Sequence, residues 1–72
     1  MIREIIVTSP QGVRLAFTTE EGAPEGLEIQ RHSPVATTMD ICDRNKPTGD
    51  GKFAIVGMVP TSWLLELNEN VT

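Results

Sequence analysis

Residues 5–17 read IIVTSPQGVRLAF, two apolar runs on either side of the turn Ser9-Pro10-Gln11-Gly12. Proline presets the φ of the second position of a type I turn, and glycine takes the left-handed conformation that follows. Such a turn with a bulge pairs Ser9 with Val13, which places Val7 opposite Leu15. Turn chemistry and hydrophobic alternation select this register independently, so a β-hairpin is expected here. Its core-facing side then carries Ile5, Val7, Val13, Leu15 and Phe17.

The same X-Pro-X-Gly turn recurs twice, as Ala23-Pro24-Glu25-Gly26 and Lys46-Pro47-Thr48-Gly49. Since the turn sequence is the same, we expect a positive φ at Gly12, Gly26 and Gly49. Between and beyond the turns lie runs rich in Ile, Val, Leu, Thr and Phe, which are typical of strands. The expected strands are Ile2 to Thr8, Val13 to Thr19, Leu27 to Arg31 and Phe53 to Val59. The segment from Trp63 to Leu67 closes the domain, as a strand or as one helical turn.

Three further segments complete this interpretation. Phe53 to Val59 is apolar at nearly every position, which indicates a central strand covered on both faces. Asp43 to Lys52 is polar and reads as a loop, and Asn68 to Thr72 reads as a polar tail.

The segment from Val35 to Cys42 allows two interpretations. Ser33 could cap a helix with Pro34 at its first position. However, apolar residues also alternate there with a period of two, and Val-Ala-Thr-Thr is rich in β-branched residues. We favour a strand and keep the helix as the alternative.

Near the C-terminus, the stretch Gly57-Met58-Val59-Pro60-Thr61-Ser62-Trp63-Leu64 resembles the end of an SH3 domain. There, a glycine and two apolar residues precede a proline, a 3₁₀ turn, an aromatic residue and a final strand. The aromatic residues of the SH3 peptide groove have no counterpart in this chain, so the resemblance implies barrel closure only. The expected fold is therefore one all-β domain spanning residues 1–72. It is a small antiparallel hairpin meander closing into a sandwich or SH3-like small barrel, with a short 3₁₀ or helical turn near the C-terminus.

Size and charge restrict the classes of function. The 72 residues hold one cysteine and a net charge of −4, from ten acidic and six basic side chains. A chain this short buries only about 60% of its unfolded surface, and one cysteine forms no internal disulfide, so self-association or a protein partner is expected. The acidic balance argues against nucleic acid. No apolar run is long enough for a membrane span and no signal peptide is visible, so we expect a cytoplasmic or virion location.

No constellation of catalytic or ligand-binding residues stands out. His32 beside Ser33 and the lone Cys42 lie in no recognisable nucleophile frame, and Asp40 and Asp43 disfavour a thiolate at Cys42. Acidic residues of the polar loop lack the spacing of a calcium loop. We therefore predict no enzyme activity, no catalytic residue, no cofactor and no metal.

Two functions of different classes remain. The first is a non-enzymatic structural or assembly protein acting through protein–protein contacts, such as a phage-type virion decoration or adaptor subunit. The alternative is a small acidic inhibitor or adaptor that binds and blocks a larger host protein. The candidate interface residues are two large apolar side chains and an acidic group: Trp63, Met58, Glu20, Glu21 and Glu25.

Overall fold

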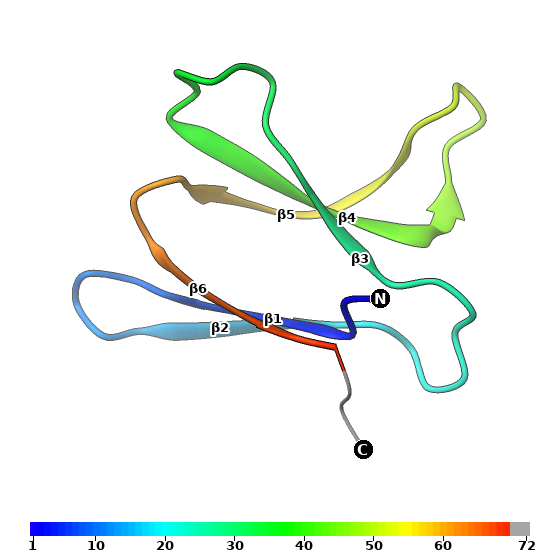
Figure 1. Cartoon of the computed structure of the whole chain (residues 1–72), viewed down its shortest axis with the longest axis horizontal. Coiled ribbons are helices and arrows are strands. Elements are labelled where there is room, and N and C mark those ends of the chain that lie inside the picture. The colour runs from blue at the N-terminus through cyan, green and yellow to red at the C-terminus, as the bar shows by residue number, and fades with distance from the viewer. Residues whose placement is uncertain (70–72) are drawn as a thin grey trace.

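Two three-stranded antiparallel sheets form the protein in a computed structural model that describes residues 1–69 (Figure 1). The strands are β1 (Glu4–Thr8), β2 (Arg14–Thr18), β3 (Leu27–Gln30), β4 (Thr38–Pro47), β5 (Phe53–Pro60) and β6 (Leu64–Asn68). The predicted all-β class is confirmed. Of the expected polar tail, Asn68 belongs to β6, and residues 70–72 lie outside the described part of the chain. Residues 1–69 contain no helix with the length and apolar character that a membrane crossing requires.

The first sheet has the strand order β2-β1-β6 and contains the predicted hairpin. Val7 pairs with Leu15 and Ile5 with Phe17, as the turn chemistry required. The Gly12 N–H donates to the Ser9 carbonyl at 2.9 Å, and Gly12 has a φ of 85°. The register prediction is therefore confirmed in full.

The burial predicted for that hairpin is only half right. Ile5 and Val7 are fully buried, whereas Val13 and Leu15 are exposed. Strand β2 lies at the edge of its sheet and has a neighbouring strand only on the β1 side. Of the three inward residues predicted beyond the turn, only Phe17 packs against the core.

The second sheet has the order β3-β4-β5, with β4 in the centre. The predicted polar loop from Asp43 to Lys52 is wrong in its first half, because β4 continues to Pro47 through a register irregularity after Asp43. The predicted strand from Val35 begins only at Thr38. The residues before it form a turn, in which the Ala36 N–H donates to the Ser33 carbonyl at 3.2 Å, so the alternative helix does not form.

The prediction of a central, doubly covered strand at Phe53 to Val59 is wrong. Strand β5 lies at an edge of the second sheet, and only its Val59 is fully buried. The central place belongs to β4, whose run Met39 to Asp43 is buried throughout. Strand order is set by pairing between distant segments, which the apolar content of one segment does not report.

The core lies between the two sheets, which Figure 1 shows as two layers with β4 in one and β1 in the other. Side chains of both sheets supply it: Ile5, Val7, Leu27, Met39, Ile41 and Val59, with Ile2, Phe17, Ile29, Trp63 and Leu65 packed against them. A backbone hydrogen bond joins the layers at one corner, where the Leu27 N–H donates to the Ile2 carbonyl at 2.8 Å. The Thr61 N–H donates to the Thr37 carbonyl at 3.0 Å and so extends the pairing of β4 with β5. The fold is therefore a small sandwich whose layers are linked at the corner beside β3.

The turns differ in how they use their glycines. Gly49 has the expected positive φ, of 90°, but Gly26 does not, so that prediction is wrong. Gly26 is instead required for close approach, because a Cβ at this position would collide with the backbone carbonyl of Ile2. The expected short 3₁₀ or helical turn near the C-terminus is one hydrogen-bonded turn, in which the Trp63 N–H donates to the Pro60 carbonyl at 3.2 Å.

Candidate functional site

Strand β5 presents large apolar side chains to solvent. Ile55 is 56% exposed, Val56 41% and Met58 64%. A register shift causes this arrangement, because Ile41 pairs with Gly57 while the next residue, Cys42, pairs with Ile55. Val56 is thus the extra residue of a β-bulge. Since directly paired residues share a face, the bulge puts Ile55 and Met58 together on the outer face of the sheet.

The edge strand β2 lies on the same side of the sandwich as β5. Phe17 of β2 contacts Gly57 so closely that a Cβ on this glycine would overlap the ring. Exposed apolar residues therefore occur at both strand edges. Those of β5 include the outer face of its sheet, and those at β2 lie on the side of the hairpin that also carries Val7. We give this group one name, the β2–β5 apolar surface: Val13, Leu15, Ile55, Val56 and Met58.

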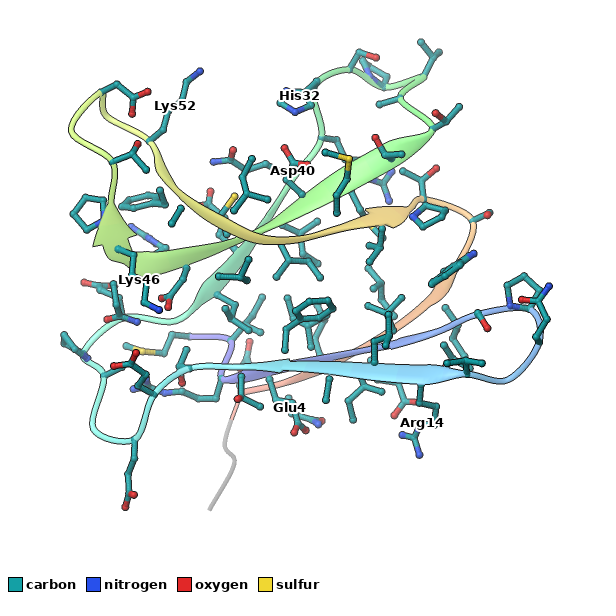
Figure 2. The ribbon with its side chains drawn as sticks, turned by 180° about the vertical axis from the view of Figure 1, so that it is seen from behind. Glu4, Arg14, His32, Asp40, Lys46 and Lys52 are labelled. Atoms are coloured by element: carbon teal, nitrogen blue, oxygen red, sulfur yellow. The ribbon has the colours of Figure 1, made fainter. Side chains whose placement is uncertain are left out.

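Beneath the side chains of β5, the outer face of β4 holds two buried polar or reactive groups. Asp40 is 2% exposed, and its Oδ2 lies 2.8 Å from Nε2 of the exposed His32 (Figure 2). Cys42, which pairs with Ile55, is 1% exposed. Burial raises the pKa of the Cys42 thiol, and the charges of Asp40 and Glu28 raise it further. The thiol is therefore neutral and shielded, which does not suit a nucleophile.

The acidic loop between β2 and β3 is fixed in place through its backbone. Nη1 of Arg3 donates to the carbonyls of Ala23 and Glu25, at 2.7 and 3.2 Å. The Asn45 side chain accepts from the Glu25 N–H at 2.8 Å and donates to its carbonyl at 2.7 Å. The side chains of this loop remain available, since Glu20, Glu21 and Glu25 are all exposed. Of these three, Glu20 is the only one that forms an ion pair within residues 1–69, and its carboxylate lies 3.5 Å from Nζ of Lys46.

Two acidic residues, Asp43 within β4 and Asp50 after it, hold local structure. Oδ1 of Asp43 accepts from the backbone N–H and the side-chain amide of Asn45, at 3.0 and 2.9 Å. Asp50 belongs to a separate turn, where its carboxylate accepts from the Thr48 hydroxyl and the Lys52 N–H. These hydrogen bonds lower the pKa of Asp50, and the one from the Thr48 hydroxyl has the largest effect. Within residues 1–69 no three His, Cys, Asp or Glu side chains gather in a way that could hold a metal ion.

The predicted interface residues fall into three separate places. Met58 belongs to the β2–β5 apolar surface, and it pairs with Asp40 near the start of β4. Trp63, in the turn before β6, is half-buried and packs against the core. The acidic loop is joined through Glu25 to Asn45, near the far end of β4. The structure therefore does not bring the acidic group together with Met58.

Sequence reasoning missed most of the β2–β5 apolar surface, because it assigned Val13 and Leu15 to the core and buried β5 on both faces. The uncharged run from Phe53 to Pro60 favoured a central strand, and it carries no local signal of the edge position that the structure shows.

Comparisons with protein-family models, with curated proteins and with solved structures found no match to this chain. The functional argument therefore depends on the geometry of the surfaces described above.

Proposed function

We propose that the protein is a non-enzymatic structural or assembly subunit that acts through protein–protein contacts at the β2–β5 apolar surface. The observation that carries this proposal is the exposure of Ile55, Val56 and Met58 on an uncharged edge strand. A subunit of this kind decorates or adapts a larger particle, as phage virion proteins do, and would be found in the virion or in the cytoplasm of the producing cell.

Physical chemistry supports the choice of this surface. Edge strands of soluble proteins are normally protected by charged side chains, and each other edge strand here has one: Arg14 in β2, Glu28 in β3 and Glu66 in β6. Strand β5 lacks one. Covering apolar surface stabilises an assembly by about 25 cal/mol per Å². Met58 is also a side chain that adapts its shape to a partner.

The alternative function, an acidic inhibitor or adaptor that blocks a larger protein, is favoured by a different observation. The loop carrying Glu20, Glu21 and Glu25 is held by Arg3 and Asn45 through its backbone, so its carboxylates are displayed on a preorganised support. Preorganisation lowers the entropy lost when such a loop binds.

The state of association separates the two proposals. We expect sedimentation of the purified chain to show reversible, concentration-dependent assembly. Met58→Glu should weaken this assembly about tenfold or more, because a charge would be buried at an interface anchor. Circular dichroism should remain unchanged, since Met58 is exposed.

Val35→Glu is the matched control. Val35 is 86% exposed in the turn before β4, outside the β2–β5 apolar surface, and receives the same charge. Assembly should persist in this variant. A chain that remains monomeric at every concentration would contradict the assembly proposal and leave the acidic inhibitor as the better account.

A further inference from the structure

A groove of about 490 Å³ lies on the side of the sandwich where β3 and β6 form the two sheet edges. Its apolar lining comes from both layers and includes Ile2, Leu27, Ile29 and Leu67. The N-terminus lies beside β3 between the two layers (Figure 1). Because β5 is the opposite edge of the same sheet, this groove is separate from the β2–β5 apolar surface.

The backbone of β3 has hydrogen-bonding groups that face this groove. The Arg44 N–H donates to the Gly26 carbonyl at 3.1 Å, so the backbone hydrogen-bonding groups of Gly26 point toward β4. The next residue, Leu27, donates its N–H to the Ile2 carbonyl and is directed away from β4. Because backbone direction alternates along an antiparallel strand, the N–H and carbonyl of Ile29 also point away from β4. At Ile29, strand β3 can therefore accept the backbone hydrogen bonds of an added strand, next to the apolar residues that line the groove.

Charge distinguishes the occupants that would suit this groove. Glu25 and Glu28 are among the residues that line it, and neither carboxylate forms an ion pair within residues 1–69. Arg44 also lines it, but its guanidinium carbon lies 5.5 Å from the centre of the Phe53 ring, on the β5 side of β4. Two unpaired carboxylates beside an apolar floor, in a chain of net charge −4, favour a cationic segment with apolar side chains.

We propose that this groove binds an extended segment of a partner protein in which apolar residues alternate with Lys or Arg. The segment adds to β3 as an antiparallel strand and pairs with the backbone of Ile29. Its apolar side chains cover Leu27 and Ile29, and its cations meet Glu25 and Glu28. Strand addition of this kind obtains affinity from main-chain hydrogen bonds and specificity from alternate side chains.

The probe for this proposal is a capped hexapeptide of alternating valine and lysine, titrated into the full chain and followed by two-dimensional NMR. We expect shifts of the backbone amides of Leu27 to Arg31 and slower hydrogen exchange at Ile29. A peptide N-methylated on alternate residues should lose these effects, because it lacks the donors for the ladder. Equal binding of the methylated peptide would overturn the strand-addition geometry.

Matched double variants test the charge argument. E25Q with E28Q should weaken peptide binding about fivefold, the loss expected for two exposed ion pairs. E20Q with E21Q removes the same charge from the neighbouring loop and should leave the affinity unchanged. Equal losses in both double variants would show general attraction to an acidic protein and would overturn the proposal.

Two other outcomes would also overturn it. Shifts confined to β5 would assign the peptide to the β2–β5 apolar surface. Protection of the Ile29 amide that grows with protein concentration in the absence of peptide would identify a second copy of the chain as the occupant. Either result can be read separately from the test of assembly, because Met58→Glu leaves the groove intact.

Discussion

Strands β4 and β5 pair along most of their lengths, yet their burial is the reverse of what their sequences suggest. The strand with charged residues is the more buried of the two, and the uncharged strand is the more exposed. Strand β4 reads TMDICDRNKP and contains four charged residues, but Met39 to Asp43 are buried. Strand β5 reads FAIVGMVP without a charge, but three of its large apolar residues are exposed. The difference is one of position, since β4 has a neighbour on both sides and β5 on one. In a sheet this narrow, place in the strand order outweighs hydropathy in deciding burial.

Polar side chains in the buried strand are tolerated because each has a partner. Asp40 bonds to His32 across the outer face, and Asp43 accepts two hydrogen bonds from Asn45. Within residues 1–69, no buried side-chain nitrogen or oxygen lacks a hydrogen-bond partner. The exposed apolar residues of β5 are instead left open to solvent, and for that reason we propose them as a contact surface.

The largest expected effect comes from truncating matched isoleucines in the two strands. Ile41→Ala in β4 removes a fully buried side chain from the core and should cost about 2–5 kcal/mol of unfolding free energy. Ile55→Ala in β5 removes an exposed side chain and should change the unfolding free energy by less than about 0.5 kcal/mol. Urea unfolding of the monomer measures both values. Similar losses at the two positions would contradict the contrast in burial.

A smaller effect is expected where β5 touches the other sheet. Gly57→Ala would push a methyl group into the Phe17 ring and should cost about 1–3 kcal/mol. Combining it with Phe17→Leu should recover part of that loss, because the smaller side chain leaves room for the methyl group. The double-mutant cycle in thermal or urea unfolding gives the coupling. If the two changes are simply additive, this contact does not hold the edge in place.

The smallest effect concerns Cys42 and appears only at alkaline pH. Burial and the charges of Asp40 and Glu28 raise the pKa of its thiol, so the folded chain keeps a proton that the unfolded chain loses. Stability should therefore fall as pH rises above the ordinary thiol pKa of about 8.5, and Cys42→Ala should remove this part of the decline. Unfolding curves at neutral and alkaline pH test the sign. An identical decline in the variant would place the titration elsewhere.

Local chemistry made the first hairpin predictable. The Ser9–Gly12 turn determines which residues pair across it, and the large apolar side chains at every second position from Val13 to Phe17 agree with that register. Strand β3 was predicted to within one residue, and its Leu27 and Ile29 belong to the core or pack against it. Each of these inferences depended only on residues close in sequence.

The remainder depended on pairing between distant segments. The edge position of β5 follows from β4 lying between it and β3, and the conformation of Gly26 follows from the approach of Ile2. The extension of β4 to Pro47 depends on a partner at Phe53 across an irregular register. Of the candidate site, Met58 could be named from sequence, but the exposure of Val13, Leu15 and Ile55 required knowledge of which strands are edges.

Strand β6 pairs with β1 across nearly the whole chain, with Glu4 opposite Asn68. Bringing two such distant segments together costs conformational entropy before their hydrogen bonds can form. This pairing is therefore expected late in folding. The hairpin of β1 and β2 and the three-stranded sheet of β3, β4 and β5 form from neighbouring segments and can appear first. Until β6 arrives, one edge of β1 remains unpaired. During synthesis the growing chain would therefore have an open strand edge until β6 has been made, and that interval is when it is most exposed to aggregation.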